Sequence, residues 1–374
     1  MKHGTDSSDG IQLLARPTRA ALARPARAAT RLRPAGPRIA GLAVADAPQT
    51  YSQEEVLERL GLSGDEFAEG IFARCGVQRR HLELSDEFLD RTLQGRAQQI
   101  DEQLMARSVQ AVDALGIDPQ RIATVFSSSL YTLGCPTLAH RLVEHYGMDP
   151  ATDKYHISGV GCASGVPLMR LAEQAMRAHP DREALIVAAE SMSGILTRAT
   201  PQDPRAKTVG SAIFGDGCAA VLLSGDPRAQ GPAIVASQVH QRPDSLGVVS
   251  LQCSAHDSYL HLERELPDLA GAGLPAVADS FLENQGLERS AIDHWIAHPG
   301  GRRIVENIGS ALGLSHDDLA TSWGSLADHG NVGTPSVLYV LQNTIAQCEP
   351  QPGELGLIVS VGPGVTLGLM LLQW

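Results

Sequence analysis

Short apolar runs alternate along the chain with segments that have the periodicity of a helix. Apolar residues recur every three to four positions in residues 101–116, 166–180 and 302–313, and this spacing predicts three helices. The apolar runs end at Gly, Ser or Pro, which is typical of buried strands. They are "RIATVFSSSL" (121–130), "ALIVAAES" (184–191), "CAAVLLSG" (218–225), "HWIAHPGG" (294–301) and "LGLIVSVGPG" (355–364). This alternation indicates a layered α/β fold.

The same pattern divides the chain into two parts of similar design. Each part contains a strand, a glycine-rich turn and a helix, so we expect a duplicated arrangement on a βαβ-type plan. Turn-forming residues cluster in "SGDPRAQGPAI" (224–234), where the two parts would meet. The prediction is an N-terminal half at residues 37–228 and a C-terminal half at residues 229–374.

The first 36 residues differ in composition from the rest of the chain. They carry seven Lys or Arg side chains and two Asp, a net charge of +5, and they are rich in Ala, Arg and Pro. Such a composition is typical of a flexible arm, so we expect residues 1–36 to lie outside the core. A transit peptide is the alternative interpretation of this segment.

Composition and charge exclude several classes of protein. The 374 residues carry a net charge of −12, which is unfavourable for binding nucleic acid. No apolar stretch reaches the roughly 18 residues of a membrane-spanning helix, so no membrane span is expected. The six cysteines form no CxxC pair, which argues against a zinc or redox site and favours a reducing, cytoplasmic location. They stand at positions 75, 135, 162, 218, 253 and 348.

One cysteine has unusual surroundings, in "HISGVGCASGVPLMRLAEQAM" (156–176). Cys162 lies between glycines just before a predicted helix, where backbone N–H groups and the helix dipole favour a thiolate. A small core thiol at a tight turn is an equally good interpretation of this stretch alone. A dinucleotide-binding loop fits poorly, because the acid Glu190 lies too far from Gly161 and the third glycine of the motif is missing.

A cysteine nucleophile needs a histidine and usually a third polar group. Most of the 13 histidines lie in polar or helical contexts, but His298 ends an apolar run and is followed by Pro-Gly-Gly, a loop of the kind that presents catalytic groups. Asn331 lies in another glycine turn before an apolar helix. His294 and His298 have the spacing of a helical zinc pair, yet the segment reads as a strand and lacks HExxH, so no metal site is predicted.

Five blocks, taken in chain order, resemble the type III polyketide synthases, the chalcone-synthase-like branch of the thiolase superfamily. The blocks are "GVGCASG", "VGSAIFGDGCAAVLL", "HWIAHPGGRRI", "DHGNVGTPSVLYVL" and "SVGPGVTLGL", and the resemblance covers residues 37–374. It implies an α/β thiolase fold with five αβαβα layers and two similar halves. It also implies a homodimer and a buried active site that coenzyme A (CoA) reaches through a tunnel.

The resemblance further implies roles for individual residues. Cys162 matches the acyl-accepting nucleophile, His298 its partner, and Asn331 the third member of a Cys-His-Asn set. Phe214 matches an aromatic gate between the CoA tunnel and the cavity, whereas Leu260 stands where a second gate phenylalanine is expected. The implied enzyme loads an acyl-CoA starter on Cys162 and extends it by decarboxylative condensation with malonyl-CoA. No cofactor beyond these CoA thioesters is expected.

The matching stretches also supply positions for the acyl cavity and for CoA. The cavity set is aliphatic and therefore favours a fatty acyl starter and an α-pyrone or resorcinol-type product; it comprises Leu130, Cys135, Ile195, Leu251, Leu260 and Gly333. The candidates for CoA are Arg74, Gly300, Gly301 and Arg303, with Arg79 and Arg80 as further cations. Two alternatives stay open: a single-condensation 3-ketoacyl synthase III-like enzyme, and a non-catalytic binding protein with the thiolase fold.

Overall fold

The computed structural model describes residues 36–374 except 131–133 and 254–257, so residues 1–35 of the predicted arm lie outside the described part. Gly36 already belongs to the folded unit, because its N–H donates to the carbonyl oxygen of Ile234 (2.8 Å). The helices are α1 (Gln53–Arg59), α2 (Glu66–Arg74), α3 (Asp86–Leu89), α4 (Leu93–Leu115), α5 (Leu138–His145), α6 (Gly165–Met176), α7 (Arg205–Ile213), α8 (Leu266–Glu283), α9 (Arg302–Leu312), α10 (Ala320–His329) and α11 (Ser336–Cys348). The strands are β1 (Arg38–Asp46), β2 (Thr50–Ser52), β3 (Arg79–His81), β4 (Ile122–Ser128), β5 (Asp153–Ile157), β6 (Glu183–Glu190), β7 (Gly217–Ser224), β8 (Ala233–Gln241), β9 (Val249–Cys253), β10 (Ser258–Leu262), β11 (His294–Ala297), β12 (Leu355–Gly362) and β13 (Thr366–Gln373).

All eight predicted elements are present, as strands β4, β6, β7, β11 and β12 and helices α4, α6 and α9. Helix α4 begins earlier than predicted, because the Thr92 side chain accepts a hydrogen bond from the N–H of Gly95 and caps the helix there. Strand β11 ends at Ala297, since Pro299 has no N–H to continue the ladder and the N–H of Gly300 turns back to the carbonyl of His298 (2.9 Å). Within the described ranges, no helix has both the length and the apolar character needed to cross a membrane.

One sheet contains strands from both halves of the chain, in the order β11-β12-β13-β8-β1-β7-β6-β4-β5. Strand β4 runs parallel to β6, and β6, β7 and β1 then follow antiparallel to one another. The set β11, β12, β13 and β8 repeats this succession of directions, and the two sets meet where Arg38 pairs with Ala233. The expectation of two similar halves is confirmed, while the boundary between residues 228 and 229 stays a prediction.

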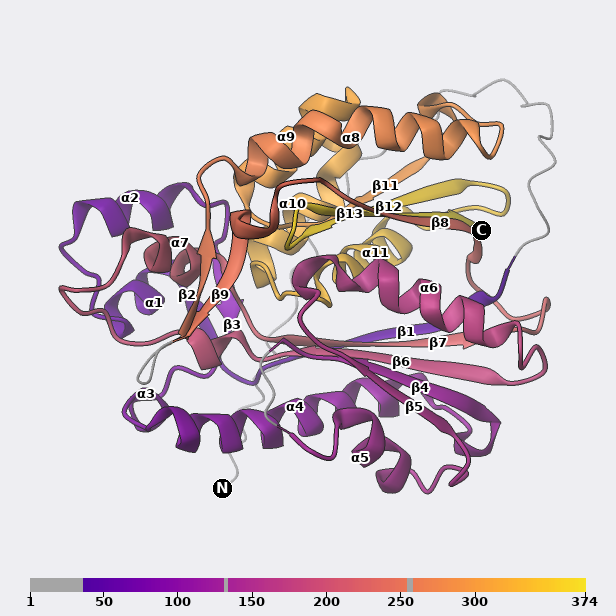
Figure 1. Cartoon of the computed structure of the whole chain (residues 1–374), viewed down its shortest axis with the longest axis horizontal. Helices are drawn as coiled ribbons and strands as arrows, with labels where there is room; N and C mark the ends of the chain where they lie inside the picture. Colours follow the sequence, from indigo (N-terminus) through magenta and orange to yellow (C-terminus); the bar gives the residue numbers. More distant parts are fainter. Residues whose placement is uncertain (1–35, 131–133, 254–257) are drawn as a thin grey trace, which may run out of the picture. The chain divides into compact units, whose positions relative to one another are not determined.

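The helices and the two parts of the sheet form five layers (Figure 1). Helices α4 and α5 pack on the outer face of the β1-β7-β6-β4-β5 part, and α8, α9 and α10 lie on the outer side of the β11-β12-β13-β8 part. Helices α6 and α11 lie in the middle and contact strands of both parts. The predicted αβαβα arrangement is therefore confirmed.

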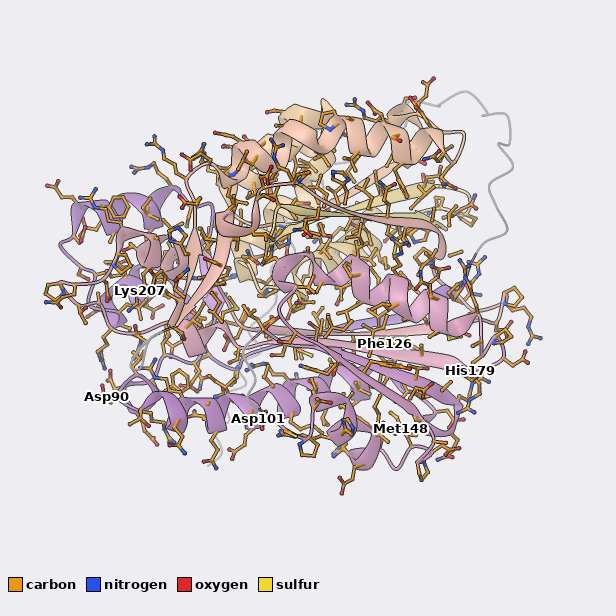
Figure 2. All side chains as sticks on the ribbon, in the orientation of Figure 1. Asp90, Asp101, Phe126, Met148, His179 and Lys207 are labelled. Carbon is orange, nitrogen blue, oxygen red and sulfur yellow. The ribbon has the colours of Figure 1, made fainter. Side chains whose placement is uncertain are left out.

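Alternating side chains explain why both faces of the sheet are covered. On β6, Ala184, Ile186 and Ala188 enter the core around α6 and α11, whereas the residues between them enter the core under α4. Phe126 of β4, labelled in Figure 2, belongs to the same middle core. Because a strand turns successive side chains to opposite faces, an uninterrupted apolar run is what a strand between two helical layers requires.

Candidate active site

Three loops converge on one cavity of about 350 Å³. Cys162 comes from the turn before α6, His298 from the end of β11, and Asn331 from the loop between α10 and α11. The predicted Cys-His-Asn set therefore lines a single space. Most of the other lining residues are aliphatic or glycine: Leu130, Gly159, Gly161, Ile213, Val249, Leu251, Leu260, Leu262, Leu266, Gly300, Ile304, Val361 and Gly362.

Cys162 lies in a 3₁₀ turn, Gly161–Ser164, that continues directly into α6. Gly161 has φ +60°, and a Cβ there would lie 2.9 Å from Cγ of Pro363. Only glycine fits this left-handed position against the turn that follows β12. The glycines around Cys162 thus serve two purposes, since Gly161 packs against Pro363 while Gly159 lines the cavity.

The Asn331 side chain has a fixed orientation. Its Oδ1 accepts hydrogen bonds from the N–H of Gly333 (2.9 Å) and from the hydroxyl of Ser336 (3.1 Å). The Sγ of Cys162 lies 3.7 Å from both Oδ1 and Nδ2 of Asn331. Because Oδ1 is already occupied by two donors, the Nδ2 amide is the group that can donate to the sulfur or to a substrate oxygen.

His298 is held by its backbone rather than by its ring. Its N–H donates to the carbonyl of Val359 on β12 (2.8 Å), and its carbonyl accepts from Gly300. A Cβ on Gly300 would lie 3.1 Å from Nε2 of His298, so this glycine leaves room for the ring. Nδ1 is buried and has no hydrogen-bond partner among the described residues.

Burial favours the uncharged forms of both the thiol and the imidazole. It raises the pKa of the Cys162 thiol to about 12, with Glu190 acting in the same direction and the Asn331 hydrogen bond opposing it. Burial also lowers the pKa of His298 to about 4. A helix N-terminus contributes at most about 2 kcal/mol, a pKa decrease of about 1.5, which is less than the effect of burial. Burial therefore opposes the thiolate that the helix N-terminus favours at Cys162, and the thiolate stays a prediction.

Phe214 lines the cavity, as the sequence predicted for a gate residue. It caps the C-terminus of α7, and its backbone forms an isolated parallel bridge with that of Asn331. Its carbonyl accepts a hydrogen bond from the guanidinium of Arg80 (2.8 Å). Arg80, one of the further cations considered for CoA, is fully buried in this role.

The predicted cavity positions separate into two groups. Leu130, Leu251 and Leu260 line the cavity, and the latter two are partners across the β9–β10 hairpin. The cavity does not reach the other three, which are Cys135, Ile195 and Gly333. Cys135 is exposed and Ile195 is packed in the core around α1 and α2.

Gly333 is a correction with a clear physical cause. Its φ is +69°, and a Cβ there would lie 2.9 Å from Cγ of Glu190. A larger residue would therefore strain the Asn331 loop and collide with a buried carboxyl group instead of filling the acyl cavity. Gly333 is a turn residue that lets its own N–H reach Oδ1 of Asn331.

The predicted CoA residues lie at the start of α9 and at the end of α2. Gly300 lines the cavity, while Gly301, Arg74 and Arg303 do not. The N–H of Arg302 donates to the carbonyl of Cys75 (3.1 Å), which joins the start of α9 to the end of α2, where Arg74 lies. Arg303 is more than half exposed and forms an ion pair with Asp268 (3.3 Å).

Sequence reasoning missed the buried carboxyl group of Glu190, the last residue of β6. It accepts hydrogen bonds from the N–H of Leu130 (2.8 Å) and from the hydroxyl of Thr334 (2.8 Å). Burial raises its pKa to about 7. Glu190 thus connects the loop after β4 to the Asn331 loop. The sequence signal for this residue was a carboxyl group at the end of an otherwise apolar strand.

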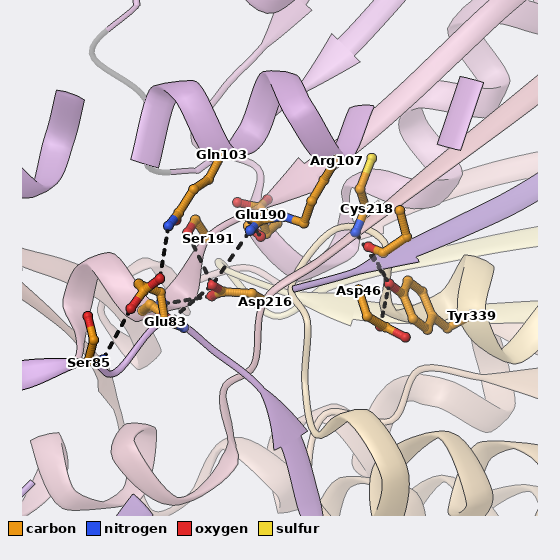
Figure 3. A network of polar contacts seen from close by, with 12 residues as sticks. Asp46, Glu83, Ser85, Gln103, Arg107, Glu190, Ser191, Asp216, Cys218 and Tyr339 are labelled. Carbon is orange, nitrogen blue, oxygen red and sulfur yellow. Dashed lines mark hydrogen bonds and ion pairs between the residues drawn. The ribbon is translucent and has the colours of Figure 1, made fainter. Parts of the chain in front are cut away.

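A second missed carboxyl group is Asp216 of the "FGDG" block, shown in Figure 3. It accepts hydrogen bonds from the N–H of Ser193 (2.8 Å) and from the hydroxyls of Ser191 and Ser193 (3.2 and 2.9 Å). The guanidinium of Arg107 lies 3.9 Å away. Asp216 lies directly before β7. It therefore links the segment after β6, which carries Ser191 and Ser193, to Arg107 of α4.

The chain matches known families over nearly all of its described length. Residues 49–242 match the model of the FAE1/Type III polyketide synthase-like protein, and residues 233–374 match the C-terminal domain of the chalcone and stilbene synthases. The 3,5-dihydroxyphenylacetyl-CoA synthase of Streptomyces toyocaensis is 28% identical over 362 residues, which are 91% of this chain and 91% of that protein. The 1,3,6,8-tetrahydroxynaphthalene synthase of Streptomyces peucetius subsp. caesius is 32% identical over 268 residues, 71% of this chain and 70% of that protein.

The fold agrees with these matches. The crystal structure of PKS-I from the brown alga Ectocarpus siliculosus is similar with a TM-score of 0.83 at 25% identity, over 91% of this chain and 99% of that one. Both kinds of similarity extend across the two halves of the chain and include the three loops of the cavity. The chain therefore belongs to the type III polyketide synthases, a family of acyltransferases with the thiolase fold.

Proposed function

We propose that this enzyme loads an aliphatic acyl group from an acyl-CoA starter onto Cys162 and extends it with malonyl-CoA. The observation that carries the proposal is the convergence of the Cys162 thiol, the His298 ring and the Asn331 amide in one largely apolar cavity. A thiol, a base and a neutral amide donor are the groups that thioester transfer and enolate formation need.

Loading begins from a neutral thiol and a neutral imidazole. The Cys162 proton passes to His298 as the sulfur attacks the thioester carbonyl of the starter. The carbon–sulfur bond to CoA then breaks, and the CoA thiolate takes the proton from His298. The products are an acyl thioester on Cys162, free CoA and a neutral imidazole, so both side chains are uncharged again.

Extension requires malonyl-CoA to lose carbon dioxide. The electron pair of the breaking carbon–carbon bond moves into the thioester, so negative charge develops on its oxygen. The Asn331 Nδ2 amide and an N–H of the neutral His298 ring donate to that oxygen without leaving a charge buried and unpaired. The apolar ring of Phe214 in the same cavity disfavours the malonyl carboxylate and thus favours its loss. The enolate carbon attacks the Cys162 thioester and releases the thiolate.

The lining of the cavity supports an aliphatic starter. Nine of its twenty lining residues are leucine, isoleucine or valine, whose side chains offer no hydrogen bond to a phenolic hydroxyl. The lining also includes two serines, Ser158 and Ser250. Each buried methylene stabilises a bound acyl chain by roughly 0.8 kcal/mol. The extended chain then cyclises to an α-pyrone or a resorcinol-type product.

The phosphates of CoA bind on the side of the site where α2 ends and α9 begins. Arg74 and Arg303 supply the positive charge there, and the ion pair of Arg303 with Asp268 is exposed and therefore contributes little energy that a phosphate must replace. Gly300 and Gly301 allow the pantetheine arm to approach the backbone beside His298.

The chemistry needs no resident cofactor, because the thioester substrates supply both the leaving group and the carbon dioxide whose release drives condensation.

The chemistry does need Cys162 as a reduced thiol. That requirement supports a cytoplasmic location, where disulfides are rare. Oxidation of Cys162 would remove the group that carries the growing chain.

The first test concerns the nucleophile. Incubation with a fatty acyl-CoA should add one acyl mass to the enzyme, and Cys162→Ala should abolish the adduct because the accepting sulfur is gone. Cys348→Ala removes an exposed thiol outside the cavity and should retain the adduct. Intact-mass spectrometry measures both, and an adduct on Cys162→Ala would overturn the assignment.

Product analysis with malonyl-CoA separates iterative extension from a single condensation. A non-catalytic protein would form neither the acyl adduct nor an extended product.

The second test concerns the charge state of the pair. If Cys162 rests as a neutral thiol, its alkylation by iodoacetamide should slow about tenfold for each unit of pH between about pH 9 and about pH 6, because only the thiolate reacts. The rate is read from intact mass, with Cys162→Ala identifying the site. A rate that stays level down to about pH 6 would instead show a preformed thiolate–imidazolium pair.

The third test concerns the length of the starter. Turnover (kcat/KM) should rise about fourfold per methylene until the cavity is full. Leu260→Phe should move the optimal starter length to shorter acyl chains, because the larger ring projects from the buried wall into the cavity. It should reduce turnover of the longest starters by at least about tenfold. Tyr259→Phe alters the neighbouring residue, which does not line the cavity, and should keep the parent profile. An unchanged profile in Leu260→Phe, with short starters still used, would remove Leu260 from the acyl site.

The fourth test concerns the homodimer, which the exposed edge of the sheet supports. Strand β5 is the last strand on its side, and Tyr155 and Leu171 are 50% and 41% exposed around one shallow depression. Light scattering should give twice the 39.6 kDa chain mass, and Tyr155→Asp or Leu171→Asp should shift it towards the monomer. Leu246→Asp, at an exposed leucine near β9, is the control. A dimer that persists in both variants would place the interface elsewhere.

A further inference from the structure

A second cluster of chemically active side chains lies outside the cavity. Asp46 is the last residue of β1, His81 the last of β3, and His329 the last of α10. One potential ligand atom from each lies within 4.8 Å of the others. None of the three lines the acyl cavity, and the proposed reaction uses none of them.

The separations within this cluster are close to those of a metal site. Nδ1 of His329 lies 3.2 Å from Oδ1 of Asp46, and Nε2 of His81 lies 3.7 Å from Oδ2. Zinc binds His nitrogen at about 2.0–2.1 Å and carboxylate oxygen at about 2.0–2.2 Å, so tetrahedral ligands lie about 3.4 Å apart. The two His–Asp separations therefore lie close to the ligand–ligand spacing of a tetrahedral site, and the stacked rings of His81 and His329 have centroids 5.3 Å apart.

Neighbouring polar groups orient two of the ligands. The hydroxyl of Tyr339 lies 3.0 Å from Oδ1 of Asp46, a contact shown in Figure 3. The hydroxyl of Thr50 lies 3.1 Å from Nδ1 of His81. With the proton on Nδ1 of His81 bonded to Thr50, the lone pair of Nε2 faces Asp46, which is how ligating histidines are held in metal sites.

Charge and access also suit a cation. The side chains of His81 and His329 are each 19% exposed and that of Asp46 29%, so the cluster is not sealed from solvent, and a water molecule would be the fourth ligand of a tetrahedral ion. The adjacent cation Arg79 is already paired with Asp328 (2.8 Å), which offsets its repulsion. Two imidazoles and one carboxylate are a ligand set that divalent transition metals accept.

We infer that Asp46, His81 and His329 bind one divalent transition-metal ion, with Zn²⁺ the best match to the ligand set. The ion joins β1, β3 and α10 at one point. His329 is two residues before Asn331, and the backbone of Asn331 is fixed between Ile213 and Gly215. Bound metal therefore restrains the start of the loop that carries Asn331.

The test is titration of the full-length, chelator-treated protein with Zn²⁺, followed by calorimetry and thermal unfolding. One ion per chain should bind, and a hundredfold excess over Kd should raise Tm by about 3–5 °C. His81→Gln and His329→Gln should each remove saturable binding and the Tm increase. In both variants the glutamine amide can still form hydrogen bonds in place of the imidazole. Circular dichroism before addition of metal checks that the variants are folded. His316→Gln, at a histidine stacked on Trp323, is the matched control and should bind as the parent does.

The competing ligand is the thiol of Cys162, so the titration is repeated in Cys162→Ala. Retained 1:1 binding there supports the cluster, as does a tetrahedral Co²⁺ visible spectrum without a sulfur charge-transfer band. Loss of binding in Cys162→Ala would overturn the site. Unchanged binding in both His81→Gln and His329→Gln, or the lack of saturable binding in the parent protein, would overturn it as well.

Discussion

The active site depends on one short contact between backbones, the isolated bridge between Phe214 and Asn331. The N–H of Asn331 donates to the carbonyl of Ile213 (2.8 Å), and its own carbonyl accepts from Gly215 (3.1 Å). This pair of hydrogen bonds joins the end of α7 in the first half to the α10–α11 loop in the second. It therefore fixes the backbone of Asn331 directly beside that of Phe214.

Burial determines the electrostatics of this site more than any single partner does. The apolar side chains of the cavity remove water from Cys162 and His298, and the pKa values of both move towards the uncharged forms. An apolar cavity and a charged thiolate–imidazolium pair therefore oppose one another.

Sequence periodicity predicted helices and strands whose surroundings stay the same along their whole length. It failed at single positions whose surroundings come from a segment distant in sequence. Strand β6 alternates between two cores over its whole length, so its apolar run was sufficient evidence. Position 333 was misplaced because its environment is set by Glu190, which is distant in sequence. The burial that raises the pKa of Cys162 was missed for a similar reason, since a helix N-terminus is visible in sequence but desolvation by distant loops is not. The Asp46–His81–His329 cluster has no motif spacing at all, because three separate elements bring it together.

The equivalence of the two halves has a consequence for how such a site can arise. In topology, β4 corresponds to β11 and β6 to β12, so the turn before α6 corresponds to the loop before α11. One of these corresponding segments carries the thiol of Cys162 and the other the amide of Asn331, while the segments after β11 and after β4 bring His298 and Leu130 to the cavity. Two identical halves on separate chains would have to carry the same residue at both places. Because both halves belong to one polypeptide, each can carry its own residue, and the chain places a sulfur in one segment and an amide in the other.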